Sequence, residues 1–568
     1  MEISFAREVE QLRLGAGQTF HGEGILAVTK ALLQSGVAYV GGYQGAPVSH
    51  LLDVMVQARP YLAELGVHVE ACANEAAAAA MLGASLHYPL RGAVTWKSIV
   101  GTNVAADALS NLASPGVVGG VLIVVGEDTG EGASVIQERT HAFAMKSTMA
   151  LLDPRPQLSW IVHLVEQAFE LSEASHLPAI LQLRIRACHL RGRFICKDNR
   201  APAVSMRAPL AQPAPFDYAR LAHPPVTFLH ERLKVEQRLP AARRFIAERG
   251  LNEIFAGDCA DVGVILQGGL FNSALRAARQ LGLTDARGGC RLPLLVLNVT
   301  YPLVHEQIAA FCRDKRAVLV LEEGQPEFIE MEIAAALRRA DIGCAVHGKD
   351  LMRVAGEYTT EAIAAGLDRF VARYLPQLPL AQGRAWLAAN AERRRQVAAE
   401  LAAPLPPRPP TFCTGCPERP VFAAMKLVQR ELGPLHVAAD IGCHAFATFE
   451  PFSQGHSILG YGMSLASRAG VSPAMASRTV AVMGDGGFWH NGLLTGVQTA
   501  LFNGDDAVLL IMKNGYTSAT GTQEIISTPS EATKAEAADK QQSLTAQEQT
   551  IENTLRGIGV RWLRTVHS

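Results

Sequence analysis

The stretch that most constrains the fold of this 568-residue chain covers residues 480–523. The apolar, β-branched run at 480–483 is typical of a buried strand, and the apolar run at 507–512 predicts a second strand. The sequence between them has helical periodicity. The residues expected on the buried face of that helix are Leu493, Leu494, Val497, Ala500 and Leu501. The stretch therefore predicts a strand, a turn, a helix and a strand, as in a parallel α/β sheet.

Glycine and polar residues follow both predicted strands. Gly484, Asp485, Gly486 and Gly487 come directly after the first strand, and Asn514 comes after the second. Glycines let the backbone approach a phosphate closely, and a helix N-terminus offers unpaired N–H groups. Carboxylate and amide oxygens are ligands that Mg²⁺ prefers. The pattern favours a diphosphate held through a divalent cation. The alternative is an ordinary strand–helix turn that contains these residues.

Composition narrows the class of protein. The chain is 49% hydrophobic, and its length suits roughly three or four domains. The net charge of −1 argues against a nucleic-acid partner. The charged N-terminal residues lack the apolar segment of a secretory signal, and no apolar run is long enough to span a membrane. Ten scattered cysteines fit a reducing compartment. We therefore expect a soluble, cytoplasmic α/β protein.

Strand-like and helix-like segments alternate through residues 1–190, which predicts a doubly wound parallel sheet. The expected strands are 37–40, 67–70, 92–96, 120–125 and 179–184, and the expected helices are an amphipathic one within 14–35, then 74–86 and 103–112.

Four further segments follow in the sequence. The predicted divisions are a connector at 191–260, a second alternating domain at 261–375, a helix and linker at 376–410, and a last domain at 411–568. The connector is expected to contain a helix near 241–249. The second alternating domain is expected to contain strands at 262–266, 294–297 and 318–322. The charged helix is expected at 385–402. Five prolines among residues 404–410 make a stiff linker and the clearest domain boundary.

Three cysteines in the last domain form a metal-site pattern. Cys413 and Cys416 have the CxxC spacing, and Cys443 follows in the sequence Asp-Ile-Gly-Cys-His. In a reducing compartment this pattern is typical of a bound metal or cluster. Zinc, a redox-active dithiol and an iron–sulfur cluster are all open on this evidence.

The turn at Asp485 resembles the signature of the thiamine diphosphate enzymes, in which Gly-Asp-Gly is followed about thirty residues later by Asn. The resemblance implies that Asp485, Asn514 and the main-chain oxygen of Tyr516 are the Mg²⁺ ligands. It also implies that the cofactor is contacted by Gly45, Ala46, Pro47, Gly442, Cys443, His444, Gly484, Gly486, Gly487 and Thr517.

The N-terminal half resembles the pyrimidine-binding domain of the 2-oxoacid:ferredoxin oxidoreductases, and most of all the large (alpha) subunit of the indolepyruvate class. The matching segments are residues 70–75, 83–85 and 101–107. The resemblance implies that the Glu75 carboxyl hydrogen-bonds N1′ of the aminopyrimidine, which promotes loss of the C2 proton. A Glu that merely complements a helix dipole is the alternative.

The same resemblance implies substrate contacts. Lys97 is expected to pair with the substrate carboxylate; a solvated lysine after a strand is the alternative. Residues 45–49 stand where the family has Gly-Thr-Pro-Ser-Ser. Because Ala46 and Val48 replace hydroxyl residues there, a substrate hydrogen bond is either missing or supplied by another group.

The family further implies a multidomain thiamine diphosphate enzyme with two doubly wound parallel-sheet cofactor-binding domains and a domain like the transketolase C-terminal domain at 261–375. In that last domain Glu322 and Glu323 match the pattern without a catalytic role. The implied reaction is oxidative decarboxylation of an arylpyruvate such as indolepyruvate or phenylpyruvate to arylacetyl-CoA and CO₂. The implied acceptor is ferredoxin or a similar carrier, with a 4Fe–4S cluster on Cys413, Cys416 and Cys443.

The implied partners are coenzyme A, the 2-oxoacid, a smaller gamma- or beta-type subunit or domain, and a second copy in a homodimer or heterotetramer. A strand is expected to begin in residues 559–566, and the last domain is expected to continue past Ser568, where a fourth cysteine would lie. A mobile loop and helix over the cofactor are expected at 517–555. The alternatives are a non-oxidative decarboxylase or lyase and a non-catalytic subunit that keeps the fold.

Overall fold

The computed structural model describes residues 4–130, 136–401, 411–528 and 550–567. The chain forms two compact units, one of residues Phe5–Leu405 and a second built on Pro406–Ser568. They are called the N-terminal unit and the C-terminal unit below.

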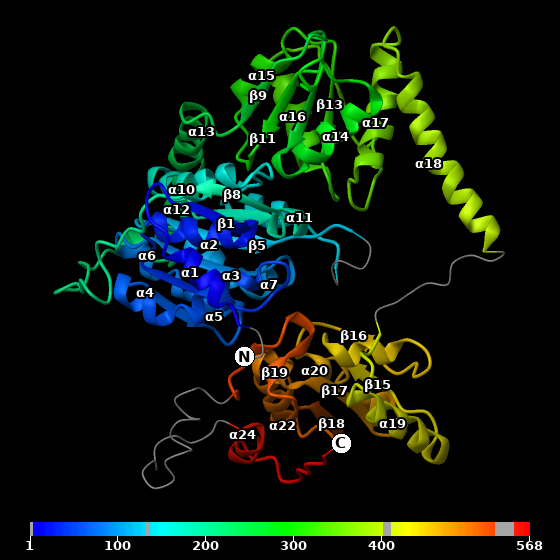
Figure 1. Cartoon of the computed structure of the whole chain (residues 1–568). Coiled ribbons are helices and arrows are strands. Elements are labelled where there is room, and N and C mark those ends of the chain that lie inside the picture. The colour runs from blue at the N-terminus through cyan, green and yellow to red at the C-terminus, as the bar shows by residue number, and fades with distance from the viewer. Residues whose placement is uncertain (1–3, 131–135, 402–410, 529–549, 568) are drawn as a thin grey trace. The chain divides into compact units, whose positions relative to one another are not determined.

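A seven-stranded sheet is the centre of the N-terminal unit (Figure 1). All its neighbouring strands are parallel except β12, which runs antiparallel to β6. In spatial order the strands are β12 (Val299–Tyr301), β6 (Ala150–Leu152), β7 (Ala179–Leu183), β5 (Val121–Gly126), β4 (Gly92–Lys97), β2 (Tyr39–Gly42) and β3 (His68–Ala71).

Helices cover both faces of this sheet because its central strands are apolar on both sides. Leu122 and Val124 of β5 enter one core, and Ile123 and Val125 enter the other. The helices are α1 (Ala6–Leu12), α2 (Gly24–Gln34), α3 (Ser49–Gln57), α4 (Arg59–Leu65), α5 (Glu75–Met81), α6 (Ala84–His87), α7 (Val100–Val104), α8 (Ala106–Ala113), α9 (Thr140–Ser147), α10 (Leu158–Ser175) and α11 (Ile185–Cys188). The doubly wound arrangement is confirmed.

The N-terminal unit holds a second, five-stranded sheet with its own helices. The strand order is β14 (Ala345–His347), β13 (Ala317–Leu321), β10 (Val262–Gln267), β11 (Leu294–Leu297) and β9 (Glu253–Phe255), the last antiparallel. Its helices are α14 (Phe271–Leu281), α15 (His305–Cys312), α16 (Phe328–Arg339), α17 (Thr360–Tyr374) and α18 (Ala381–Glu400). Figure 1 shows α18 as a long helix that extends away from this sheet.

The segment between the two sheets is more regular than a surface connector. Strand β8 (Arg191–Ile195) pairs with β1 (Thr19–Glu23), and β9 joins the five-stranded sheet. The helices here are η1 (Tyr218–Arg220), α12 (Val226–Leu233), η2 (Lys234–Arg238) and α13 (Leu239–Glu248). The predicted helix near 241–249 is confirmed in α13.

A four-stranded parallel sheet organises the C-terminal unit. Its order is β16 (Ser457–Ile458), β15 (Val437–Ala439), β17 (Thr479–Gly484) and β18 (Ala507–Met512). A short pair, β19 (Tyr516–Thr517) and β20 (Gln523–Glu524), follows β18. The helices are α19 (Glu418–Leu432), η4 (Cys443–Thr448), α20 (Ser464–Ser467), α21 (Asp485–Gly487), η6 (Phe488–Gln498), α22 (Thr499–Asn503) and α24 (Ile551–Gly557).

Three predictions about secondary structure are wrong. Residues 559–566 contain no strand: Trp562 and Val566 are exposed and pair with no neighbouring strand. The helix after β17 buries Val497 but exposes Leu494, because its π-helical hydrogen bonding widens the turn and changes which residues share a face. Helix α2 is buried along its whole length rather than amphipathic.

One further segment differs from its prediction, and another is not tested. The helix expected at 74–86 is two helices, α5 and α6, separated at Gly83. Most of the loop expected over the cofactor, at 529–549, lies outside the described residues.

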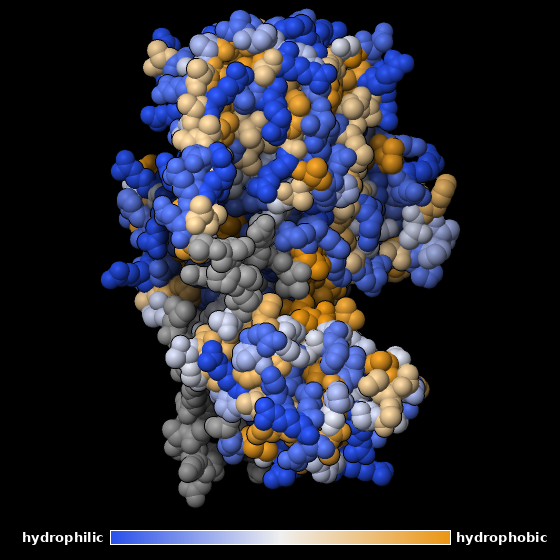
Figure 2. Space-filling view, turned by 90° about the vertical axis from the view of Figure 1, so that its right-hand side faces the viewer, coloured by the Kyte–Doolittle hydropathy of each residue, from blue (hydrophilic) through white to orange (hydrophobic). Residues whose placement is uncertain are grey.

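In the part of the chain that the structure describes, none of the helices combines the length and the apolar character needed to cross a membrane. Figure 2 shows hydrophilic side chains mixed with smaller apolar areas on the displayed face.

Candidate functional site

The carboxylate of Asp485 connects the ends of two neighbouring strands. Strand β17 ends at Gly484, and Asp485 opens the next helix with its side chain buried. One carboxylate oxygen accepts hydrogen bonds from the backbone N–H groups of Asn514, at 2.9 Å, and Gly515, at 2.6 Å. The other accepts from the N–H of Gly486 at 2.9 Å. Burial raises the pKa of Asp485, although these three backbone donors lower it in part.

Two glycines of the turn have no room for a side chain. A Cβ on Gly486 would lie 2.2 Å from the hydroxyl of Tyr461, and one on Gly487 would lie 2.3 Å from the carboxylate of Asp440. Gly484 differs, since its nearest neighbour would be His444 at 3.8 Å. The glycines at 486 and 487 are therefore required by close packing, whereas a Cβ at Gly484 would make only an ordinary contact with His444.

Behind this turn lies a buried pair, Asp440 and His444. Asp440 follows β15, accepts a hydrogen bond from the N–H of Gly462 at 2.6 Å, and forms an ion pair with His444. Burial alone would lower the pKa of His444, but the hydrogen bond and charge of Asp440 outweigh it and raise the pKa. Gly442, which is predicted from the sequence to be a cofactor contact, packs against the His444 ring.

The loop after β18 completes this edge of the sheet. The side-chain oxygen of Asn514 accepts from the N–H of Tyr516 at 3.2 Å, and its amide nitrogen donates to Ser518 at 3.2 Å. The hydroxyl of Thr517 hydrogen-bonds the side chain of Gln523 at 3.2 Å. Asp485, Asn514 and Tyr516 thus lie at one edge, as predicted from the strand ends.

The donor chemistry at this edge fits the magnesium diphosphate that the sequence predicts. A carboxylate, an amide oxygen and a main-chain oxygen are hard oxygen donors, which suit Mg²⁺. In the described residues no group of three or more His, Cys, Asp or Glu side chains is arranged to hold a metal ion. The predicted magnesium set contains a single side chain of those types, Asp485, and it stays a prediction.

The three predicted cluster cysteines do not form a metal-binding group among the described residues. Cys413 is exposed, whereas Cys416 and Cys443 are half-buried, and all three are free thiols. The Cys443 sulfur is 3.5 Å from the Ser518 hydroxyl, and burial raises the pKa of the Cys443 thiol. The iron–sulfur cluster is therefore not supported by the geometry and stays a prediction.

In the N-terminal unit, Glu75 is a buried carboxyl at the first turn of α5. Asn74 caps this helix by accepting from the N–H of Ala77 at 3.0 Å. Glu75 itself is 4% exposed. A Cβ on Gly101 would lie 2.6 Å from the Trp96 ring and 2.9 Å from Cγ of Glu75. The carboxyl is therefore enclosed by β4 and α7, more deeply than a Glu needs to be to complement a helix dipole.

The loop at Gly45, Ala46 and Pro47 lies across the ends of two neighbouring strands. A Cβ on Gly45 would lie 2.5 Å from Lys97 at the end of β4, and one on Gly126 would lie 2.5 Å from Pro47. Both close approaches are at the carboxyl edge of the seven-stranded sheet, where parallel α/β sheets bind their ligands.

Lys97 is ion-paired rather than solvated. Its amine is 2.7 Å from the carboxylate of Asp128, and the two side chains are 18% and 6% exposed. The other oxygen of Asp128 accepts from the N–H of Ile185 at 3.2 Å. Sequence reasoning missed Asp128 and Asp440 as site residues. Asp440 comes directly after β15 and Asp128 comes two residues after β5, so a position near a strand end was a usable signal.

Comparison with known protein families also indicates a thiamine diphosphate site in the C-terminal unit. Residues 440–568 match the family described as the thiamine pyrophosphate enzyme, C-terminal TPP binding domain. That segment contains Asp440, Asp485 and Asn514. The fold and this match together define a multidomain α/β enzyme that uses thiamine diphosphate.

Several curated proteins are similar over most of the chain. The indolepyruvate oxidoreductase subunit IorA of Methanothermobacter thermautotrophicus is 28% identical over 548 residues, which is 95% of this chain and 81% of that protein. The subunit of the same name from Archaeoglobus fulgidus is 28% identical, over 95% of this chain and 80% of its own. A solved 2-oxoglutarate:ferredoxin oxidoreductase from Magnetococcus marinus aligns at 15% identity, TM-score 0.47, over 62% of this chain and 65% of that one. These similarities support a thiamine diphosphate-dependent 2-oxoacid:ferredoxin oxidoreductase family for this chain.

Proposed function

We propose that this chain is the thiamine diphosphate-binding catalytic subunit of a cytoplasmic enzyme that oxidatively decarboxylates an arylpyruvate, such as indolepyruvate or phenylpyruvate. The products are CO₂ and an arylacetyl-CoA, and the electrons pass to ferredoxin or a similar acceptor. The arylpyruvate and coenzyme A follow from the names of the similar proteins and from the family resemblance. The identity of the 2-oxoacid and the use of coenzyme A are therefore the most specific elements of the proposed reaction.

The observation that carries the proposal is the position of Asp485. Its carboxylate accepts hydrogen bonds from the backbone of Asn514 and Gly515 across the ends of two parallel strands. This fixes the carboxylate beside the backbone of Asn514, whose side-chain oxygen accepts from the N–H of Tyr516. We assign the carboxylate, the side-chain oxygen of Asn514 and the main-chain oxygen of Tyr516 to Mg²⁺, which would neutralise a diphosphate at the helix N-terminus.

When bound, thiamine diphosphate supplies the carbon nucleophile for the 2-oxo carbon and accepts the electron pair released with CO₂. The role assigned to Glu75 is to share a proton with the N1′ nitrogen of the cofactor. An enclosed carboxyl suits this task because a group that transfers a proton has to be held within hydrogen-bond reach of it. Lys97 is assigned to the substrate carboxylate, for which it would exchange part of its pairing with Asp128.

The electron path is assigned to Cys413, Cys416 and Cys443 with a 4Fe–4S cluster. All three are free thiols, and Cys443 interacts electrostatically with Cys416 and Cys413. A one-electron carrier is what a ferredoxin requires. The partners proposed are a smaller gamma- or beta-type subunit or domain and a second copy of this chain.

An anaerobic assay of the full chain, with any protein that co-purifies, tests this proposal. Reduction of a viologen dye is followed on indolepyruvate and phenylpyruvate, with and without coenzyme A. Dye reduction that requires coenzyme A is the expected result. Aldehyde release without dye reduction would favour the non-oxidative decarboxylase, and thiamine diphosphate binding without any turnover would favour a non-catalytic subunit.

A further inference from the structure

A network of buried charges joins the two sheets of the N-terminal unit. From the five-stranded sheet come Glu322 and Glu323, which follow β13 directly. From the seven-stranded sheet come Arg139, just before α9, and Arg184, just after β7. All four are buried or nearly so: 3% exposed at Arg139, 1% at Glu322, 12% at Arg184 and 4% at Glu323. Charged residues are rarely buried without a partner, so their pairing needs a reason.

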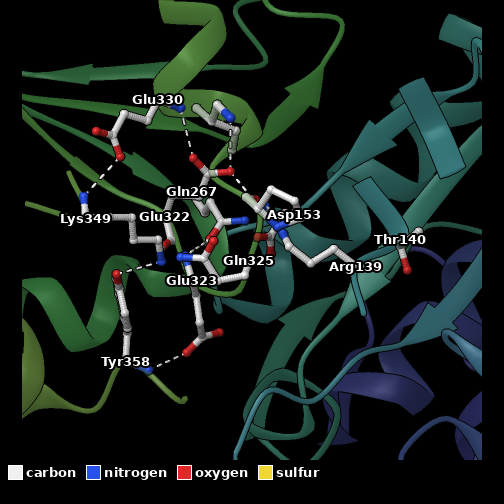
Figure 3. Close-up of polar contacts among 12 residues, drawn as sticks. Arg139, Thr140, Asp153, Gln267, Glu322, Glu323, Gln325, Glu330, Lys349 and Tyr358 are labelled. Carbon is white, nitrogen blue, oxygen red and sulfur yellow. Dashed lines mark hydrogen bonds and ion pairs between the residues drawn. The ribbon is translucent and has the colours of Figure 1, made fainter. Parts of the chain in front are cut away.

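Arg139 pairs with Glu322. A guanidinium nitrogen of Arg139 is 2.5 Å from one carboxylate oxygen, and the same nitrogen donates to the carbonyl of Pro326. Glu322 also accepts from the backbone N–H groups of Ile329, at 3.0 Å, and Glu330, at 2.9 Å, at the start of α16. Figure 3 shows Arg139 reaching toward this carboxylate. Glu322 is therefore held by a helix terminus on one side and by Arg139 on the other.

Arg184 is the second connection and pairs with two carboxylates. It donates to Asp153 at 2.8 Å and to Glu323 at 2.9 Å, and also to the side chain of Gln267 at 3.2 Å. Gln267 in turn accepts from the N–H of Glu323 at 2.8 Å. Glu127 lies close enough to Arg184 to interact electrostatically with it. Arg184 thus balances a group of carboxylates that would otherwise repel one another.

The backbone makes room for both arginines. A Cβ on Gly324 would lie 2.9 Å from the side chain of Arg139, and one on Gly269 would lie 2.7 Å from Nε of Arg184. A Cβ on Gly269 would also lie 2.4 Å from the carboxylate of Asp153. The absence of a side chain at Gly324 and Gly269 therefore leaves space for the two arginine side chains.

Each arginine is next to a residue that anchors the carboxyl edge of the seven-stranded sheet. The N–H of Thr140, after Arg139, donates to Glu127 at 2.8 Å. The N–H of Ile185, after Arg184, donates to Asp128 at 3.2 Å. Asp128 is the partner of Lys97 at 2.7 Å. The two arginines are therefore one residue away from the hydrogen bonds that fix Glu127 and Asp128.

We propose that Arg139 and Arg184 are positioning residues for the carboxyl edge of the seven-stranded sheet. Through these arginines, Glu322 and Glu323 of the five-stranded sheet hold Glu127 and Asp128 in place. Asp128 in turn holds the amine of Lys97. The five-stranded sheet then does more than pack the unit together, because it fixes the group that meets the substrate carboxylate. The assignment of Lys97 to the substrate rests on the proposed function.

The test compares Glu322→Gln and Glu323→Gln with a matched control, Glu253→Gln. The control removes a charge from an Arg–Glu pair in the same unit: Glu253 is 2.6 Å from Arg155, and both side chains are 18% exposed. Within the described residues, that pair forms no hydrogen bond or ion pair with Glu127 or Asp128. Each variant keeps the size of the side chain and weakens one ion pair.

Two readouts do not depend on turnover. The backbone amides of Thr140 and Ile185 should exchange hydrogen roughly tenfold faster in the respective test variants, as local opening becomes easier. Trace acetylation of Lys97, followed by mass spectrometry, should also become several-fold faster. In Glu253→Gln both rates should match the wild type. Equal rates in test and control variants would overturn the proposal.

The kinetic readout links the network to the substrate. The KM for the 2-oxoacid should rise roughly tenfold in the test variants, since small displacements of a binding group are costly, while thiamine diphosphate affinity stays unchanged. Faster exchange with an unchanged KM in an active enzyme would also overturn the proposal. If the wild-type chain turns over no 2-oxoacid, the proposed function fails, and the exchange and acetylation rates still decide whether the network holds Lys97.

Discussion

Two buried carboxylates in the two units are held in different ways. Asp485 is fixed by the backbone, through N–H groups of Gly486, Asn514 and Gly515. Glu75 is closely packed, with Gly101 pressed against it and against Trp96. A group held by backbone donors keeps its place when nearby side chains change, whereas a group held by packing is sensitive to a single added methyl. The first arrangement suits holding a charged cofactor, and the second suits proton transfer at a set distance.

Glu75→Gln is expected to give the largest effect, because it removes the proton-sharing group and leaves the packing intact. Exchange of the C2 proton of bound thiamine diphosphate should slow by about 10³-fold, in the range of general acid–base contributions. Proton NMR of the complex in D₂O measures the rate. Normal exchange would show that another residue contacts N1′ and would end the proposed division of roles.

Asp485→Ala should affect binding rather than proton exchange. Loss of the carboxylate removes a cation ligand and leaves the N–H groups of Asn514 and Gly515 without their acceptor. The affinity for thiamine diphosphate in Mg²⁺ should fall by about 100-fold, or about 3 kcal/mol. Titration calorimetry checks this. Unchanged affinity would mean that the cofactor is held elsewhere.

Gly101→Ala sharpens the comparison by testing the packing around Glu75. The added methyl would overlap Trp96 and Glu75, which should cost about 2–3 kcal/mol of unfolding free energy. Gly343→Ala is the control, since its Cβ would have no neighbour within 4 Å. Denaturant unfolding of both variants gives the difference. Equal stability would show that the carboxyl is not tightly enclosed.

Replacing Asp153 by Asn should have a smaller effect, on how the free energy of unfolding depends on pH. Burial raises the pKa of Asp153 to about 6, although the charge of Arg184 opposes the shift. Because the folded state then binds the proton more tightly than the unfolded state, this carboxyl contributes stability at low pH that is lost as the pH rises through about 6. Between pH 4.5 and 6 the wild type should lose roughly 1–2 kcal/mol relative to Asp153→Asn. Parallel pH profiles in denaturant unfolding would contradict the assignment.

The strand positions could be read from the sequence because the strands are apolar runs of four to six residues, buried in β11 and half-buried in β18. The runs at 294–297 and 507–512 coincide with β11 and β18. The meeting of Asp485 and Asn514 was also predictable, since consecutive parallel strands end at the same edge. The fold class is confirmed by the two doubly wound sheets and by the domain match.

The missed features depend on contacts between residues distant in sequence. Arg139 and Glu322 are 183 positions apart, and no local pattern connects them. Strand β12 joins the seven-stranded sheet from a segment assigned to another domain. The π-helical turn after Asp485 exposed Leu494 although its spacing indicated burial. In each case tertiary packing decided the outcome.

Equilibrium titration of the full chain with thiamine diphosphate, with and without Mg²⁺, tests the central claim most directly. We expect saturable binding that requires the divalent cation, because the Asp485 edge offers oxygen donors for a cation and backbone N–H groups for a diphosphate. Absence of saturable binding in Mg²⁺, or equal affinity after complete removal of divalent cations, would contradict the account.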